Sequence, residues 1–273
     1  MIQFYINVVV SQPKEDLGSA LNTNSFDPTD TTRLTNTDVL WNLDSKLSHL
    51  SESQRQGMEK LLLEFEYLFP DVPTRTDQFC HDTDVGNANP IKHHPYRLNP
   101  SNQKYLKEEI KYLPEKDFIK PSNSCWSSPC ILVPKPDGSY RMCTDYRKLN
   151  SGTKTDSFPI PQMDDCIDKV GKAKYVTKFD LLKGFWQVPL TDRPKEISAF
   201  VTPDGLYQYK VMPFGMKNSK ASFQHLINKV IADLEGCEAY INDVIIYSDM
   251  WEEHLRILRE FFERLSRAML TMS

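Results

Sequence analysis

The 273-residue chain is 40% hydrophobic and 26% charged, a composition typical of soluble globular proteins with one or two domains. Its six cysteines form no CxxC pair and no zinc-ligand spacing, which argues against a zinc module and favours a reduced, cytoplasmic or nuclear setting. No apolar run is long enough to cross a bilayer, so no membrane partner is expected. The formal net charge of -4 by itself argues against nucleic-acid binding.

Charge is distributed unevenly along the chain. Residues 1–90 carry 14 acidic and 6 basic side chains, whereas residues 91–175 carry 15 basic and 10 acidic ones. A basic segment of this kind attracts phosphate backbones. A solvated surface with uneven charge explains the same pattern, so both interpretations stay open at this point.

The N-terminal third of the chain divides into two segments. Residues 11–45 are rich in Ser, Thr, Asn and Asp, and the segment 1–45 is expected to be ragged or disordered. Residues 46–90 are expected to form a helical lead-in. Its helix spans Ser51 to Phe69, with apolar residues at helical spacing and a capping box at its start.

Residues 91–273 are expected to form the main domain. A helix opens at Asn99-Pro100, with proline at the first helical position. A hairpin is expected within residues 129–147 because β-rich pieces flank a Pro-Asp-Gly turn. Further on, strands are expected at 175–179 and 207–212, and helices at 162–170, from Ser219 to about 234, and at 251–270.

Two apolar runs, Cys237–Ile241 and Val244–Tyr247, flank the polar pair Asn242-Asp243. This pattern predicts a tight β-hairpin with the polar pair at its tip. Helices combined with mainly antiparallel strands indicate an α+β fold.

Asp180 ends an apolar strand, and Asp243 lies at the predicted hairpin tip. A carboxylate at a strand end and acidic groups on a neighbouring turn can hold magnesium, which prefers oxygen ligands. Two such ions, about 3.5–4 Å apart, promote phosphoryl transfer. Taken alone, either aspartate is more often an ordinary turn residue.

Six stretches, in one order, overturn that interpretation because they resemble the gypsy-type reverse transcriptases of long-terminal-repeat retrotransposons. The resemblance is strong from about Pro90 to Leu265. The stretches are SNSCWSSPCILVPKPDGSYRMCTDYRKLN, FPIPQMDD, KFDLLKGFWQVPL, FVTPDGLYQYKVMPFGMKNSKASFQ, YINDVIIYS and EEHLRIL.

The resemblance implies a right-hand polymerase fold, of which this chain contains the fingers and palm. It also implies an RNA or DNA template with a primer, a deoxynucleoside triphosphate (dNTP) and two Mg²⁺ ions as partners. The catalytic positions it implies are Asp180, Asn242 and Asp243, with Asp180 and Asp243 as metal ligands. In the family the tip motif reads Tyr-x-Asp-Asp, so Asn242 replaces an aspartate.

The resemblance also implies five nucleotide-binding residues. Lys135 and Arg141, in the fingers hairpin, grip the triphosphate, although solvated hairpin charge is the plainer interpretation of both. Phe185 matches an aromatic gate that excludes a ribose 2'-hydroxyl by bulk. A buried aromatic is the alternative interpretation, and the two are compatible because a half-buried aromatic can still line a pocket. Phe214 and Gly215 match a loop beside the nucleotide, where glycine permits close backbone approach.

Three questions remain open from the sequence. Gln187 is expected to give either structural support or a template contact. The chain stops just past the expected last palm helix, so neither a thumb nor a ribonuclease H domain is expected within it. Asn242 lacks a charge, so three interpretations of the chain stay open. It is an RNA-directed DNA polymerase fragment whose rate is lowered by about 10²–10⁴-fold, a non-catalytic nucleic-acid- or protein-binding remnant, or a pseudogene product. The oligomeric state is not predicted.

Overall fold

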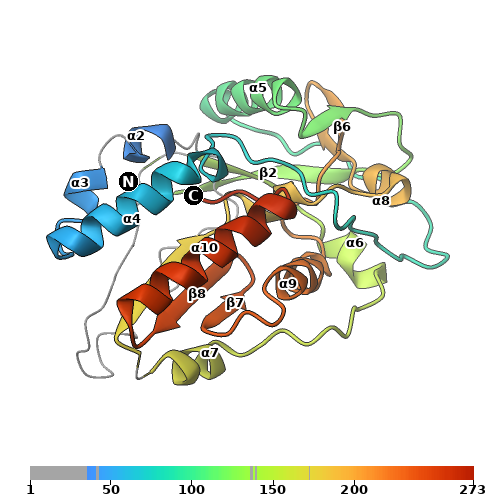
Figure 1. Cartoon of the computed structure of the whole chain (residues 1–273). Coiled ribbons are helices and arrows are strands. Elements are labelled where there is room, and N and C mark those ends of the chain that lie inside the picture. The colour runs from blue at the N-terminus through green and yellow to red at the C-terminus, as the bar shows by residue number, and fades with distance from the viewer. Residues whose placement is uncertain (1–35, 41–42, 136–137, 139, 172) are drawn as a thin grey trace.

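The computed structural model describes residues 36–40, 43–135, 138, 140–171 and 173–273. Within them, helices pack against two β-sheets (Figure 1). One sheet has the strand order β1-β6-β5-β2-β3 and the other β4-β8-β7. The strands are β1 (Ile119–Pro121), β2 (Ser128–Pro134), β3 (Tyr140–Thr144), β4 (Tyr175–Asp180), β5 (Phe200–Thr202), β6 (Gly205–Tyr209), β7 (Cys237–Tyr240) and β8 (Asp243–Ser248).

Strands β2 and β5 pair in parallel, and the other pairs of strands are antiparallel. The expected α+β fold with a mainly antiparallel sheet is therefore confirmed. The helices are α2 (Asn36–Leu40), α3 (Leu43–Lys46), α4 (Glu52–Glu64), α5 (Pro100–Glu115), α6 (Arg147–Gly152), α7 (Met163–Val170), α8 (Asp192–Ile197), α9 (Ser219–Val230) and α10 (Trp251–Arg267), with 3-10 turns η2 (Glu66–Leu68) and η3 (Gly184–Gln187).

The hairpin predicted within residues 129–147 is formed by β2 and β3. Its last pair joins Pro134 to Tyr140. The turn begins where Gly138 N donates to Lys135 O at 3.0 Å, and Gly138 has a φ of 81°, which glycine adopts without steric cost. Pro136 and Asp137 lie outside the described residues.

Helices α4 and α10 lie side by side and cover one face of the three-stranded sheet (Figure 1). The Phe262 ring of α10 lies 5.5 Å from that of Phe65, at the end of α4, and 5.4 Å from that of Phe179 in β4. The lead-in segment and the main domain therefore share one hydrophobic core. No helix in the described part of the chain is long and apolar enough to cross a membrane.

The structure describes only part of the stretch 1–45, which was expected to be ragged or disordered. Residues 1–35 and 41–42 lie outside the described residues, but α2 and α3 are helical. Asn36 is buried, and its Nδ2 donates to Pro70 O and to Met272 O, each at 2.8 Å. These long-range hydrogen bonds hold α2, and Leu43 of α3 is buried in the hydrophobic core.

A buried histidine joins α10 to the strands beneath it. His254 Nε2 lies 2.7 Å from Thr177 Oγ1 on β4, and its Nδ1 lies 3.1 Å from Ser248 Oγ on β8. Burial lowers the pKa of His254 to about 4, so the imidazole is neutral near pH 7. This contact holds together the two strands whose ends carry Asp180 and Asp243.

Candidate active site

The predicted hairpin is formed by β7 and β8, whose closing pair is Tyr240 and Asp243. Its two-residue turn is Ile241-Asn242, one residue earlier than the expected tip Asn242-Asp243, because Asp243 already pairs with Tyr240 as the first residue of β8. Ile241 has a φ of 55°, in the left-handed region that tight hairpin turns use. A β-branched residue rarely adopts this conformation, so surrounding contacts must hold it.

Asp180 is the last residue of β4, and its Cα is paired in register with that of Asp243. The next residue, Leu181, donates its N–H to Asn242 O at 2.9 Å. The structure therefore brings Asp180, Asn242 and Asp243 together at one end of the three-stranded sheet.

Burial disfavours the charged form of both carboxylates. Asp180 reaches the surface in part, but its Oδ1 is buried without a hydrogen-bond partner in the part of the chain that the structure describes. Burial raises the pKa of Asp180 well above its ordinary value, and the nearby charge of Asp243 raises it further. Burial also raises the pKa of Asp243, while the Lys178 ammonium, 3.1 Å from Asp243 Oδ1, opposes that rise.

Asn242 is 2% exposed, and neither its Oδ1 nor its Nδ2 has a hydrogen-bond partner among the described residues. A Cβ added to Gly184 would lie 2.4 Å from Asn242 Oδ1 and 2.7 Å from the tip of the Phe223 ring. Only glycine at position 184 leaves room for the Asn242 side chain. The sequence analysis missed this residue, although it is the first glycine after Asp180.

The donor set fits a hard divalent cation. Asp180, Asn242 and Asp243 all offer oxygen atoms, the ligand type that Mg²⁺ prefers. Buried polar atoms normally have partners, so the unpaired oxygens of Asp180 and Asn242 are in keeping with a ligand-binding role. The described residues contain no metal-binding group of three or more His, Cys, Asp or Glu, in keeping with an asparagine at the third position.

Gln224, a second residue that the sequence analysis missed, supports the hairpin from α9. Its Oε1 accepts from Ile241 N at 2.7 Å, and its Nε2 donates to Ala239 O at 3.0 Å. Gln224 is fully buried. No local signal marks it, because the contact joins a helix to a turn that follows it in the sequence.

Of the expected nucleotide-binding residues, Phe185 lies in η3 and is 4% exposed. Its ring centroid is 5.0 Å from that of Phe214 and 5.6 Å from that of Phe223. The structure therefore packs Phe185 against Phe214 and buries it.

Phe214 and Gly215 lie beside a pocket of about 140 Å³ between β3 and the 3-10 turn η3. Gly215 has a φ of 91°, which favours glycine. A Cβ there would make only ordinary contacts, 3.6 Å from Thr144 O. The backbone conformation therefore favours glycine at position 215 independently of the close approach to a nucleotide that the resemblance implies. The pocket is lined by Met142, Cys143, Thr144, Trp186, Tyr209, Phe214 and Gly215.

Lys135 and Arg141 lie at the end of the β2–β3 hairpin, where Arg141 pairs with Val133. They belong to the five-stranded sheet, whereas Asp180 and Asp243 belong to the three-stranded sheet. Burial lowers the pKa of the Arg141 guanidinium from its ordinary value.

Gln187 gives structural support. It is fully buried, and its Nε2 donates to Leu182 O at 2.9 Å and to Thr271 O at 2.8 Å. Its Oε1 accepts from Thr271 N at 2.7 Å. These contacts tie the segment after Asp180 to the C-terminal residues, and a fully buried side chain has no surface to offer a template.

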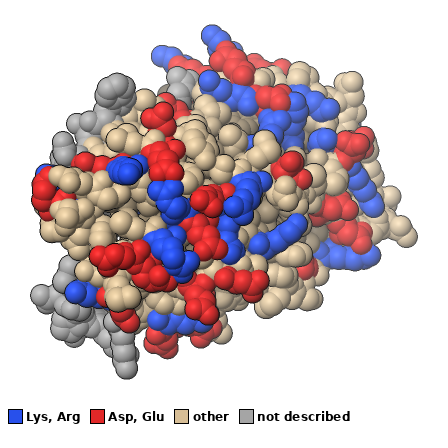
Figure 2. Space-filling view, in the orientation of Figure 1, with Lys and Arg blue, Asp and Glu red and all other residues tan. Residues whose placement is uncertain are grey.

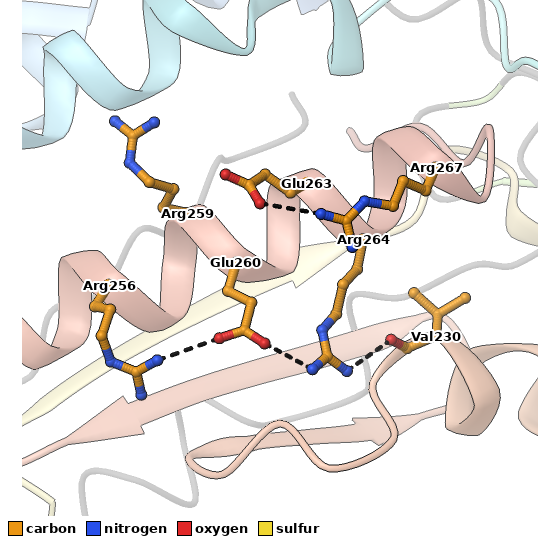
Figure 3. A pocket seen from close by; sticks show the side chains of 7 residues that line it. All are labelled: Val230, Arg256, Arg259, Glu260, Glu263, Arg264 and Arg267. Atoms are coloured by element: carbon orange, nitrogen blue, oxygen red, sulfur yellow. Dashed lines mark hydrogen bonds and ion pairs between the residues drawn. The ribbon is translucent and has the colours of Figure 1, made fainter.

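A charged groove of about 480 Å³ runs along α10, but it contains none of the expected site residues (Figure 3). Acidic and basic side chains are interleaved on this face (Figure 2). Each arginine of the groove pairs with a glutamate, which is typical of a solvated helix face rather than an anion site. The pairs are Arg256 with Glu253 and Glu260, Arg259 with Glu64, Arg264 with Glu260, and Arg267 with Glu263.

Residues 133–273 match the family described as "Reverse transcriptase (RNA-dependent DNA polymerase)". The Retrovirus-related Pol polyprotein from transposon 297 of Drosophila melanogaster is 35% identical over 237 residues, which cover 83% of this chain and 22% of the relative. The genome polyprotein of Petunia vein clearing virus (isolate Hohn) is 32% identical over 192 residues, which cover 68% of this chain and 9% of the relative. The chain thus spans about a fifth or less of these two relatives.

Among solved structures, the Prototype Foamy Virus protease-reverse transcriptase (CSH mutant) aligns with a TM-score of 0.79 and 26% identity, over 89% of this chain and 33% of that one. The foamy viral enzyme in complex with an RNA/DNA hybrid aligns with a TM-score of 0.81 and 24% identity, over 94% of this chain and 35% of that one. The likeness supports the expected fingers-and-palm fold. The chain belongs to the reverse transcriptase family, as the reverse transcriptase region of a gypsy-type long-terminal-repeat retrotransposon Pol polyprotein.

Proposed function

We propose that this domain adds deoxynucleotides to a primer 3'-hydroxyl on an RNA or DNA template, with a catalytic step weakened by Asn242. The observation that carries the proposal is the pairing of Asp180 with Asp243 across β4 and β8, with Asn242 beside them. Oxygens of Asp180 and Asn242 in this group lack partners within the described residues.

In this proposal Asp180 and Asp243 hold Mg²⁺, and Asn242 offers a neutral oxygen. Two bound divalent cations supply activation of the attacking hydroxyl and stabilisation of the leaving oxygen. A neutral amide stabilises them less than a carboxylate, because removing one strong electrostatic element costs several kcal/mol.

The incoming triphosphate is bound by Lys135 and Arg141, whose charges suit phosphate oxygens. Phe185 excludes a 2'-hydroxyl through the bulk that it adds behind Phe214. Phe214 and Gly215 themselves line the neighbouring pocket. Foamy viral relatives of this fold bind double-stranded DNA or an RNA/DNA hybrid. The net basic segment 91–175 supports a similar partner here.

A second candidate function is a non-catalytic nucleic-acid-binding domain. The observation that favours it is Asn242, which leaves two carboxylates where the family motif has three. Such a domain binds primer–template but extends no primer, even when Asn242 is changed to aspartate, so primer extension by that variant separates the two functions.

The metal site is tested by the substitution Asp180→Asn, compared with Asp249→Asn, which removes the charge of an exposed residue just beyond β8. Asp180→Asn is expected to abolish Mn²⁺ binding, followed by electron paramagnetic resonance, while Asp249→Asn leaves it unchanged. Without metal, Asp180→Asn is expected to raise the melting temperature. The pKa of Asp180 is higher in the folded than in the unfolded state, so this carboxyl costs stability at neutral pH. The cost decreases as the pH falls through the folded-state pKa and is gone below the unfolded-state pKa. Equal Mn²⁺ binding by both variants would refute the site.

The nucleotide site is tested by the substitution Arg141→Gln, compared with Arg147→Gln. Arg147 is exposed at the start of α6 and forms an ion pair with Asp145 at 2.6 Å. Arg141→Gln is expected to raise the Kd for a fluorescent dNTP by about tenfold, because charge-assisted hydrogen bonds contribute about 1.5–3 kcal/mol. Arg147→Gln should leave the Kd unchanged. An unaltered Kd in Arg141→Gln removes this residue from the proposed site.

A further inference from the structure

Lys178 precedes Asp180 by two residues on β4, so the two side chains leave the same face of the strand. Residue 180 is paired with Asp243, which makes Asp243 the diagonal neighbour of Lys178 across the β4–β8 pair. Long side chains reach diagonal neighbours in antiparallel sheets. The ammonium of Lys178 does so, and lies 3.1 Å from Asp243 Oδ1.

This ion pair is shielded from water. The side chain of Lys178 is 20% exposed and that of Asp243 is 10% exposed. Two adjacent buried carboxylates repel each other, and a cation beside them offsets part of that cost. The neutral Asn242 leaves Asp180 and Asp243 as the anionic side chains of the triad, so one lysine balances half of their charge.

From this geometry we infer that Lys178 is the built-in counterion of the carboxylate pair and competes with divalent metal ions for Asp243. The inference rests on the proposed metal site. An ammonium 3.1 Å from Asp243 Oδ1 occupies space that a cation coordinated by that oxygen needs. Two cations on the same oxygen also repel each other, so the ammonium must leave when the metal binds.

The direct test compares Mn²⁺ binding by the whole chain with binding by Lys178→Met, which keeps most of the side-chain length and removes the charge. Electron paramagnetic resonance measures the free Mn²⁺. Lys178→Met is expected to lower the Kd for Mn²⁺ by about tenfold, because the competing charge is gone. The same substitution is expected to lower the melting temperature without metal, since Asp243 loses its counterion.

Two controls separate competition from a general charge effect. Lys178→Arg keeps the positive charge and is expected to keep the original Kd. Lys183→Met removes a charge three residues after Asp180, from an ammonium that lies over the Trp186 ring at 4.9 Å. It is expected to change the Kd less than Lys178→Met does. A lysine that only stabilises the fold lowers the melting temperature without tightening Mn²⁺ binding, and that result overturns the inference.

A second measurement uses the unsubstituted chain and so holds even where a variant fails to fold. Acetylation of Lys178 by an N-hydroxysuccinimide ester is followed by mass spectrometry with and without Mn²⁺. Metal binding is expected to release the ammonium and increase its acetylation several-fold. Unchanged acetylation of Lys178 in Mn²⁺-bound protein overturns the inference.

The outcomes also distinguish this inference from the proposed function. If Asp180→Asn loses Mn²⁺ binding but Lys178→Met keeps the original Kd, the metal site is supported and the competition by Lys178 is refuted. If the unsubstituted chain binds no Mn²⁺ but Lys178→Met binds it clearly, the proposed metal site and the competition by Lys178 are both supported. No Mn²⁺ binding by either protein removes both.

Discussion

Primer extension is expected to rise by about 10²–10⁴-fold when Asn242 is replaced by aspartate. Asn242 is buried beside Asp180 and Asp243, and within the described ranges its Oδ1 has no hydrogen-bond partner. An aspartate at this position adds an anionic oxygen without changing the size of the side chain. The gain belongs to the chemical step because the added charge acts where negative charge develops in the transition state.

The same substitution is expected to lower the melting temperature when no metal is present. A third carboxylate beside two buried ones increases their repulsion, and one Lys178 ammonium cannot balance three charges. Added Mg²⁺ should then stabilise Asn242→Asp more than the unsubstituted chain, since a ligand that binds only the native state stabilises it.

The measurement is single-turnover extension of a primed RNA template at high protein concentration, so that weak template binding does not mask the chemistry. Asn89→Asp, which adds the same charge at an exposed position, serves as the control and is expected to leave extension unchanged. Equal extension by Asn242→Asp and the unsubstituted chain contradicts the view that Asn242 disables the site.

The β7–β8 hairpin was predictable from the sequence because its cause is local, although its turn lies one residue earlier than expected. Apolar runs on both sides of a polar pair leave few alternatives to a tight turn. The lead-in helix was also predictable from local contacts, since Ser51 N donates to Gln54 Oε1 at 3.1 Å as a capping box requires. The likeness of six motifs to a known family then assigned roles that neither pattern could give.

Features that depend on long-range packing were not predictable. The helix expected from Ser219 does begin there, but the preceding Asn218 is its N-cap residue, and Asn218 Nδ2 donates to Lys154 O at 2.8 Å. Ser219 Oγ instead donates to Pro213 O at 3.1 Å. The burial of Phe185 likewise depends on Phe214, which lies on a later loop. Residue type and spacing do not predict such contacts between segments that are far apart in the sequence.

Gln224 is expected to be a positioning residue, and its loss should cost about 10²-fold in extension rate in the Asn242→Asp background. Gln224 bonds to the backbone on both sides of Tyr240, at Ala239 O and Ile241 N. Ile241 has a φ of 55°, which a β-branched residue adopts only under constraint. Gln224→Met has nearly the same size but removes both hydrogen bonds, so the hairpin tip relaxes, and displacement of about 1 Å is enough for such a loss.

A double substitution tests whether the strain at Ile241 is the cause. Glycine adopts a positive φ without steric cost, so Ile241→Gly should recover much of the rate lost in Gln224→Met. Asn228→Ala is the matched control, because Asn228 Oδ1 accepts from Gln224 Nε2 at 2.7 Å and belongs to the same helix. It should retain most of the activity.

Kinetics separate positioning from mere stability. Gln224→Met is expected to lower kcat and raise the Mg²⁺ concentration needed for half-maximal rate, while KM for the dNTP changes little, because Lys135 and Arg141 lie on the other sheet. A variant that is only less stable loses active protein at every Mg²⁺ concentration and keeps the same metal dependence. Independent effects of Gln224→Met and Ile241→Gly would show that Gln224 does not act through the turn, since coupled residues give non-additive changes.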